Sequence, residues 1–353
     1  MKAAAVADQG ARTFAFVEPL DWSQLRALLW EACESSSPKS QPDWEEVASL
    51  VNRRCPDSSP QTAETYREVV ERMQSQLPEA RDIFESPGAG QRLWTKLLYE
   101  TVHHLLQFKP VFMNLGFAEL DPQADSLELD PTQEPFRLFI QLYRHVLKPA
   151  KLEGSDVLEV GCGAGGGARF VMGHYHPRSL VGIDLVEANI AEALAQPPLP
   201  GLTFQLGDAS ALPFPDNSFD VVVNIESSHC YPSMPQFLNE VKRVLRPNGL
   251  FLFADHRPTS DEWGSQRTIA SLQDDLRETG MEILRDEDIT PNINAASEML
   301  NEGKQFVLSL SSIHGIERVH FEEIMHLRGS RNYENLMSGA WQYRCYALQK
   351  SPA

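Results

Sequence analysis

The stretch DVLEVGCGAGGG, residues 156–167, decides the fold. Its first five residues are mostly apolar, which predicts a buried strand, whereas five of the next seven are glycine. Glycine adopts positive φ and lets a ligand approach the main chain without a Cβ in the way. In open α/β sheets, ligands bind at the carboxyl ends of the strands. The stretch therefore predicts a strand whose end meets a ligand.

The composition is that of a soluble globular protein, because 42% of the 353 residues are hydrophobic and 23% are charged. No apolar run has the length of a membrane span or of a signal-peptide core, so we expect no membrane association. The net charge of -18 argues against a nucleic-acid partner, which requires clustered Lys and Arg. The five cysteines have no CxxC spacing, so we expect reduced thiols in a cytoplasmic protein.

The pattern of apolar residues changes near residue 151. Between residues 21 and 108, Leu and Val recur at helical spacing, and Ser- and Pro-rich loops separate the helices. From residue 151, short apolar runs alternate with helical or loop segments: VLEV, LVGIDL, LTFQLGDA, FDVVVNIES and LFLFAD. This alternation predicts a mostly parallel sheet covered on both faces. We therefore divide the chain into a helical N-terminal region, residues 1–148, and an α/β core, residues 149–353.

The second half of the core contains further predicted elements. A helix is expected over residues 235–245, with Gly249 of the following RPNG as its C-terminal stop. Two more strands are expected at 281–289 and 341–350. Between them, at about 292–340, lies a helical insert that we interpret as a lid over the substrate, together with the N-terminal helices.

Residues outside the glycine loop restrict its ligand. A phosphate-binding P-loop is excluded because no Lys-Ser/Thr pair follows the glycines. Gly161, Gly163 and Gly166 fit a dinucleotide fingerprint, but an S-adenosylmethionine site uses a similar loop. Asp184 ends the second strand about 20 residues further on, where a carboxylate can accept both ribose hydroxyls.

The third and fourth strands supply the remaining groups of the predicted site. Asp208 can pair with the exocyclic amine of an adenine, and Ala209 can offer its backbone N–H to the ring. The fourth strand leads into Asn224, Ile225 and Glu226 at the same edge of the sheet. These positions favour a ligand that carries adenosine.

The motifs EVGCGAG, GIDL, GDASALPFPDNSFDVVV and FLNEVKRVLRPNGLFLFAD resemble the class I S-adenosylmethionine-dependent methyltransferases, over about residues 150–255. The resemblance implies a Rossmann-like fold with a mostly parallel seven-stranded sheet and S-adenosylmethionine as cofactor. It also implies that the glycines admit the methionine moiety and that Glu159 holds its amino group. The predicted cofactor residues are Glu159, Gly161, Gly163, Gly165, Asp184, Leu185, Asp208, Ala209, Asn224 and Ile225.

Three segments point to a narrower group within that family: IESSHCYPSMPQFLNEVKRVLRPNGLFLFADHR, FMNLGFAEL and SGAWQYRCYAL. They resemble phthiotriolone-type small-molecule O-methyltransferases and the O-methyltransferase domains of polyketide synthases. The resemblance implies methylation of a hydroxyl on a polyketide-like acceptor, free or tethered to an acyl carrier protein, and a place in a larger synthase. C- or N-methylation of a small molecule or lipid stays open as an alternative. A pseudoenzyme scaffold is disfavoured, because the glycine loop and Asp184 are intact.

Methylation of a hydroxyl calls for a general base, most often His, because the hydroxyl has a very high pKa. His229 follows the fourth strand at the mouth of the predicted site and is the first candidate. His256 is the rival and His326 the third. A carboxylate would orient the imidazole, and the sequence does not rank the candidates, which are Glu226, Asp255, Glu322 and Glu323. We find no further carboxylate cluster and predict no metal.

Overall fold

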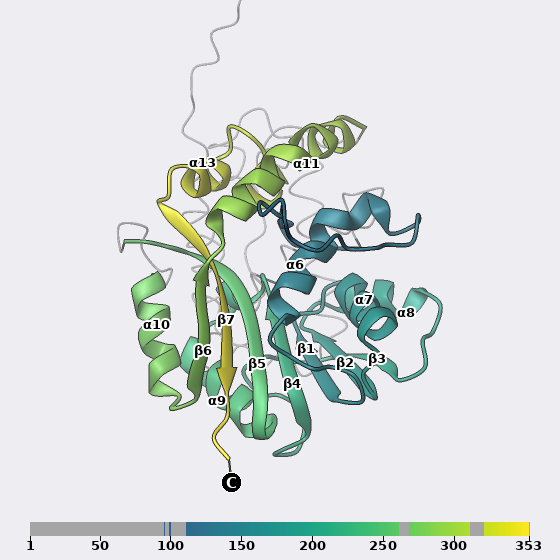
Figure 1. Cartoon of the computed structure of the whole chain (residues 1–353), viewed down its shortest axis with the longest axis vertical. Coiled ribbons are helices and arrows are strands. Elements are labelled where there is room, and N and C mark those ends of the chain that lie inside the picture. Colours follow the sequence, from purple (N-terminus) through teal and green to yellow (C-terminus); the bar gives the residue numbers. More distant parts are fainter. Residues whose placement is uncertain (1–94, 96–98, 100–110, 261–267, 311–320, 353) are drawn as a thin grey trace, which may run out of the picture. The chain divides into compact units, whose positions relative to one another are not determined.

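The computed structural model describes residues 95, 99, 111–260, 268–310 and 321–352 (Figure 1). The predicted helices of residues 21–108 lie outside the described residues, except that Thr95 and Tyr99 are helical. The boundary at residue 148 stays a prediction.

Within the described residues, the core is a seven-stranded sheet in the order β3-β2-β1-β4-β5-β7-β6 (Figure 1). Strands β1 to β5 are mutually parallel, and β7 is antiparallel to both β5 and β6. The predicted fold class is confirmed. The strand order reverses on either side of β1, which places a crevice outside the carboxyl ends of β1 and β4. The strands are β1 Asp156–Val160, β2 Ser179–Asp184, β3 Leu202–Leu206, β4 Phe219–Ile225, β5 Leu245–Pro258, β6 Glu282–Asp288 and β7 Trp341–Gln349.

Two apolar cores cover the two faces of the sheet because neighbouring strand residues point to opposite sides. Val157 packs into the core that contains α6 and α7, whereas Leu158 packs into the core that contains α9 and α10. In β4, Val221 and Val223 face the first core and Val222 the second. The helices in the described part of the chain are η1 Glu134–Phe136, α6 Arg137–Leu147, α7 Gly166–Tyr175, α8 Glu187–Ala195, η2 Ser228–Cys230, α9 Met234–Val244, α10 Ile269–Glu278, α11 Thr290–Leu310 and α13 Arg331–Met337.

Helix α9 occupies the predicted position, but the predicted stop at Gly249 is wrong. The helix begins after Ser233, whose hydroxyl accepts a hydrogen bond from Gln236 N, and it ends at Val244 because Leu245 is already extended. The residue with positive φ is Asn248, at 63°. Gly249 allows close packing of the backbone instead, because a Cβ there would lie only 2.8 Å from the carbonyl oxygen of Arg246.

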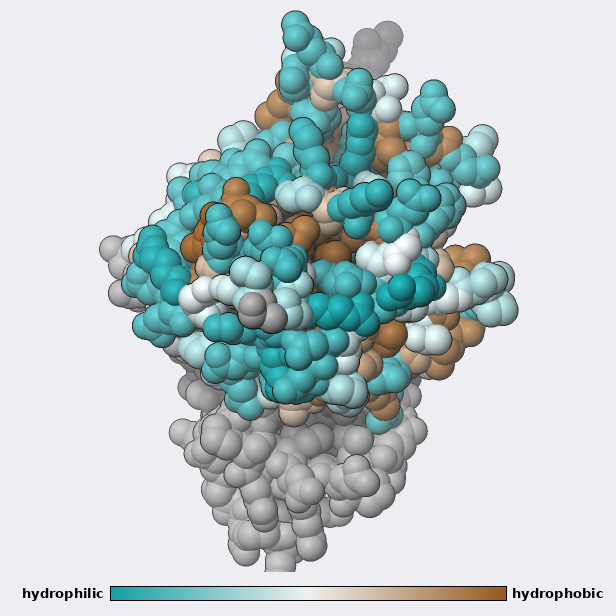
Figure 2. All heavy atoms as spheres, turned by 60° about the horizontal axis from the view of Figure 1, so that its bottom comes forward, coloured by the Kyte–Doolittle hydropathy of each residue, from teal (hydrophilic) through white to brown (hydrophobic). Residues whose placement is uncertain are grey.

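The insert is helical where it is described, as predicted, and its residues 311–320 lie outside the described part. Helix α11 is joined to α13 by a hydrogen bond from Asn294 Nδ2 to Leu336 O. Met299 and Phe306 are exposed, whereas Tyr333 is buried. None of the described helices has the length and apolar character needed to cross a membrane. Hydrophilic side chains cover most of the coloured surface in Figure 2, between scattered hydrophobic ones. The cytoplasmic location stays a prediction.

Candidate functional site

The glycine loop turns sharply against the ends of β2 and β4. Gly161 and Gly163 have φ values of 75° and 53°, which favour glycine. A Cβ on Gly161 would lie 1.9 Å from Ser227 Oγ, and one on Gly163 would lie 2.3 Å from Met113 Cε. At Gly161 the close neighbour is a side chain of the loop after β4. Bare backbone is therefore required where the loop meets its neighbours across the crevice.

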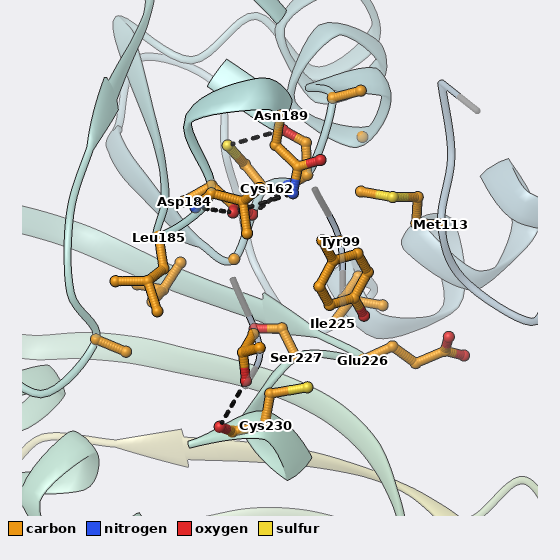
Figure 3. A pocket seen from close by; sticks show the side chains of 18 of the residues that line it. Tyr99, Met113, Cys162, Asp184, Leu185, Asn189, Ile225, Glu226, Ser227 and Cys230 are labelled. Atoms are coloured by element: carbon orange, nitrogen blue, oxygen red, sulfur yellow. Dashed lines mark hydrogen bonds between the residues drawn. The ribbon is translucent and has the colours of Figure 1, made fainter. Parts of the chain in front are cut away.

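The crevice contains a pocket built from the ends of β1, β2 and β4 (Figure 3). In Figure 3, Asp184 and Leu185 lie on one side of it, and Tyr99 and Met113 on the other. Of the predicted site residues, those that line the pocket are Gly161, Gly163, Asp184, Leu185, Asp208, Ala209, Ile225 and Glu226. Sequence reasoning missed several of the other lining residues, among them Tyr99, Met113, Asn189, Ser227, Cys230 and Tyr231.

Asp184 fixes the loop from the end of β2. Its Oδ2 accepts a hydrogen bond from Gly163 N at 2.9 Å, and its Oδ1 accepts from Val186 N at 2.9 Å and from Asn189 Nδ2 at 3.0 Å. Asn189 lies in the first turn of α8, and its position five residues after the acid is the signal that could have identified it. The carboxylate thus fixes the glycine loop relative to the segment that follows β2.

Glu159 lies beneath the loop with one oxygen unsatisfied. Its Oε1 accepts a hydrogen bond of 2.7 Å from the hydroxyl of Tyr143, on α6. Its Oε2 is buried without a hydrogen-bond partner. Burial raises the pKa of Glu159 to about 7 against the effect of the tyrosine hydrogen bond. A cationic group beside Oε2 would stabilise the ionised carboxylate.

Besides Glu159, two predicted cofactor residues lie behind the pocket instead of lining it. Asn224 is fully buried, and its Nδ2 donates to Val160 O at 2.8 Å and to the hydroxyl of Tyr231 at 2.8 Å. Gly165 is the N-cap of α7, and a Cβ there would lie 2.6 Å from the ring of Phe204. Both residues support the walls of the pocket, and their predicted contact with a cofactor stays a prediction.

His229 forms a close pair with Asp255. His229 lies in η2, between the pocket residues Ser227 and Cys230, and its Nδ1 is 2.9 Å from Asp255 Oδ1. The Asp255 side chain is fully buried, whereas 26% of the His229 side chain is exposed. Nδ1 is thus paired with the carboxylate, Cys230 is a second side-chain hydrogen-bond partner of the ring, and His229 itself does not line the pocket.

The charges around this pair favour the protonated ring. Burial lowers the pKa of His229, but Coulombic interactions and hydrogen bonds with Cys230 and with the Asp255 carboxylate together hold it well above its usual range. Burial raises the pKa of Asp255, yet the neighbouring Arg257 and His229 keep it well below its usual range. Arg257 Nη1 lies 3.1 Å from Asp255 Oδ2. Asp255 is thus an ionised, buried partner for the imidazole.

The other candidate carboxylates face elsewhere. Glu226, with a φ of 49°, directs its Oε1 to Leu115 N at 2.8 Å. Burial raises the pKa of Glu226 to about 7. Glu323 accepts hydrogen bonds from the backbone of Arg331 and of the residue after it, at the start of α13, and Glu322 precedes it in the chain. Asp255 is therefore the carboxylate that the structure brings to His229.

His256 lies next to this pair without being equivalent to His229. Its ring centroid is 4.7 Å from that of His229 and 5.0 Å from that of Trp341, on which it stacks. Burial, followed by the charge of His229, lowers the pKa of His256 to about 3. Its Nδ1 is 3.5 Å from Asp255 Oδ1 and has no hydrogen-bond partner. The ring is neutral.

The ligand atoms of His229, Asp255 and His256 lie within 4.8 Å of one another, a spacing that could hold a metal ion. The guanidinium of Arg257 contacts the same carboxylate, and a fixed positive charge there repels a second cation. We assign no metal to this group, and the absence of a metal requirement stays a prediction.

Comparison with known proteins identifies the family. Residues 158–253 match the family model described as a methyltransferase domain. The chain is 48% identical over 182 residues to the probable phthiotriol/phenolphthiotriol dimycocerosates methyltransferase 2 of Mycobacterium ulcerans (strain Agy99), covering 51% of this chain and 70% of that protein. The chain belongs to the class I S-adenosylmethionine-dependent methyltransferases.

Two further comparisons give a relative in sequence and a solved structure of similar fold. It is 36% identical over 259 residues to the fatty-acid O-methyltransferase of Mycolicibacterium smegmatis (strain ATCC 700084 / mc(2)155), covering 72% of this chain and 89% of that protein. Its fold is similar to geranyl diphosphate C-methyltransferase from Streptomyces coelicolor A3(2), with a TM-score of 0.52, 15% identity, and coverage of 75% and 99% of the two chains. The family and the cofactor predicted from the motifs are confirmed.

Proposed function

We propose that this methyltransferase transfers the methyl group of S-adenosylmethionine to a hydroxyl of a lipid- or polyketide-like acceptor, with His229 as general base. The observation that carries the proposal is the 2.9 Å contact between His229 Nδ1 and the buried Asp255 carboxylate, next to two residues that line the pocket. The names of the mycobacterial relatives support a lipid-like acceptor.

The residues of the pocket fit the cofactor. The buried, unpartnered Oε2 of Glu159 suits the amino group of the methionine moiety, because an ammonium restores the charge that burial disfavours. Gly161 and Gly163 leave the backbone open to that moiety. Asp184, at the end of β2, would hold the ribose hydroxyls, and Asp208, which lines the same pocket, would hold the adenine.

S-adenosylmethionine supplies a methyl group already activated by its sulfonium. The protein must align the acceptor oxygen with that methyl, exclude water, and take up the hydroxyl proton. His229 Nε2 accepts the proton as the new O–CH₃ bond forms, and Asp255 keeps the other ring proton on Nδ1 and stabilises the imidazolium. The imidazolium then releases its proton to solvent through the exposed part of the ring.

A carboxylate acceptor is the second candidate, favoured by the name of the fatty-acid O-methyltransferase relative. A carboxylate is already ionised near neutral pH, so it needs no general base. The His229–Asp255 pair would then have no catalytic task, which is why we place the hydroxyl first. C- and N-methylation, a carrier-tethered acceptor and a place in a larger synthase stay predictions.

The test combines labelled cofactor with product analysis. Candidate acceptors, free and carrier-tethered, are incubated with methyl-labelled S-adenosylmethionine and analysed by mass spectrometry before and after alkaline hydrolysis. An ether at a hydroxyl survives hydrolysis, whereas an ester at a carboxylate does not. His229→Ala should lower turnover about 100-fold or more and leave cofactor affinity unchanged, and His256→Ala is the matched control. Label found only as ester, or full turnover by His229→Ala, would overturn the proposal.

A further inference from the structure

Helix α11 buries polar side chains beside apolar ones and also exposes two large apolar side chains. Met299 and Phe306 are 67% and 63% exposed, whereas Ser297 and Asn301 are 2% and 1% exposed. The buried face also contains fully buried apolar residues, so it is mixed, whereas the buried face of a surface helix is normally apolar. Residues three and four apart share a helix face, so Lys304 lies on the same face as Ser297 and Asn301. This buried polar face requires a physical reason, because burying polar groups without partners costs free energy.

The segment that precedes α13 packs against this face. Leu308, on the same face, packs with Phe321 and Leu327. Between those two lies Met325, whose carbonyl oxygen accepts a hydrogen bond of 2.9 Å from Lys304 Nζ. His326 is therefore adjacent to the residue that Lys304 contacts.

Several polar atoms in this region have no partner. Asn301 Nδ2, Ser297 Oγ and His326 Nδ1 are buried without a hydrogen bond. Burial lowers the pKa of Lys304 to about 8, and the charge of Glu226 opposes that change. In folded proteins nearly all buried polar atoms are satisfied, so a group of unsatisfied ones needs an explanation. The Lys304 ammonium has three donors, and the bond to Met325 uses one of them.

This polar face is connected to the proposed base through two rings. The ring centroid of His326 lies 5.5 Å from that of His256, which in turn lies 4.7 Å from that of His229. An acceptor whose hydroxyl reaches His229 is thus within the length of a short chain from His326. Most of the groups on the face are N–H donors, which select a ligand that presents oxygen lone pairs.

We propose that Asn301, Lys304 and His326 form a subsite for a carbonyl or carboxylate oxygen of the acceptor, separate from the hydroxyl that His229 deprotonates. The inference rests on the proposed function and narrows its substrate class to oxygenated acyl chains, such as hydroxy acids and their esters. Asn301 and Lys304 donate to this oxygen, and His326 donates from the ring nitrogen that carries its proton. A charged donor makes the bond to a carboxylate stronger than that to an ester carbonyl.

Calorimetry with three probes tests the subsite: 3-hydroxydecanoic acid, its methyl ester, and 2-decanol, each added to protein saturated with S-adenosylhomocysteine. We expect Lys304→Met and Asn301→Leu to weaken binding of the acid about 10- to 100-fold. Binding of 2-decanol should not change. Lys304→Arg should retain most of the affinity, and Gln305→Met, at an exposed neighbouring position, is the matched control. A larger loss for the acid than for the ester identifies a carboxylate, and equal losses identify a carbonyl.

Two results would overturn the subsite. Either the wild type binds the acid and the ester no better than 2-decanol, or the variants weaken all three probes equally while their melting temperatures fall. The measurement does not depend on turnover. If selective binding is lost in the variants while no probe is methylated, the subsite stands and the proposed O-methylation fails.

Discussion

Replacing Asp255 by Asn tests the assignment of the base, because the change keeps the shape of the side chain and removes one charge. The two carboxylate oxygens face different partners. Oδ2 faces three donors, from Ser228 Oγ at 2.6 Å, His229 N at 2.9 Å and Arg257 Nη1 at 3.1 Å. Oδ1 faces His229 Nδ1 at 2.9 Å and His256 N at 2.8 Å. The new amide nitrogen, itself a donor, is therefore placed on the Oδ1 side, against His229 Nδ1, where it meets one fixed donor, His256 N, instead of three.

An amide N–H at that place donates to Nδ1 and moves the ring proton to Nε2. Nε2 is the nitrogen that must accept the proton of the acceptor, so the base is in the wrong tautomer. The lost charge-assisted hydrogen bond alone is worth about 1.5–3 kcal/mol, or about 10- to 150-fold in rate. With the wrong tautomer added, we expect Asp255→Asn to lower turnover by about 10²- to 10⁴-fold.

The pH profile separates this account from a general loss of structure. His229 acts as a base only when its ring is deprotonated, and Asp255 helps to hold its pKa well above the usual range. Wild-type turnover should therefore rise as the pH passes through this raised pKa. Without the carboxylate the pKa of His229 falls. The pH at which turnover of Asp255→Asn rises (the acidic limb of its profile) should therefore be lower than in the wild type, and its maximal turnover should be smaller.

The assay measures initial rates with methyl-labelled cofactor across the pH range. Asp216→Asn, which removes a carboxylate whose side chain is 70% exposed, is the control for net charge. Asp255→Asn also removes the carboxylate that balances the charge of the buried Arg257, at a cost of about 3–5 kcal/mol. Melting and cofactor affinity are therefore measured on the same samples. Unchanged turnover, or an acidic limb at the wild-type pH in a folded variant, would refute the pairing.

Three further predictions concern the pocket and its support. The pKa of Glu159 is raised to about 7, so its carboxyl must lose a proton before it binds a cationic amino group. Below that pH, cofactor affinity measured by calorimetry should fall about tenfold per pH unit. In Glu159→Gln, the affinity should be independent of pH. Asp184→Ala should weaken cofactor binding about 10- to 100-fold, and an unchanged dissociation constant would contradict the ribose assignment. Gly167→Ala places a Cβ 1.9 Å from Tyr143 Cζ and should lower the free energy of unfolding by about 1–3 kcal/mol in denaturant titration, whereas Gly173→Ala, where a Cβ meets nothing within 4 Å, should not.

The sequence predicts the sheet well because its signals are local. The apolar runs of β1 to β5 and the glycine loop lie where the pattern places them, since alternation and backbone freedom are properties of neighbouring residues. The directions of single side chains at strand ends are not local. Asn224 follows the pattern of a pocket residue, yet its amide is directed to Val160 O and to Tyr231, seven residues further on. That direction depends on partners which only the folded chain brings together.

The partner of the base could not be ranked for the same reason. Parallel pairing places Ile225 opposite Ala254, so Glu226, just past the end of β4, and Asp255, within β5, lie side by side. The positive φ of Glu226 turns its carboxylate to Leu115 N. Asp255 continues in an extended strand and is covered by η2. One backbone angle thus decides which of two neighbouring carboxylates meets the imidazole.

The structure also explains why two adjacent histidines do not share the role of base. Asp255 Oδ1 lies 2.9 Å from His229 Nδ1 but 3.5 Å from His256 Nδ1, so the shared carboxylate stabilises a proton on His229 more strongly. Burial against Trp341 lowers the pKa of His256, and the charge of a proton on His229 lowers it further. His256 is thereby kept neutral across the working pH range. Between the base and the polar face of α11 it acts as an uncharged wall, which leaves His229 as the ring of this pair that takes up a proton.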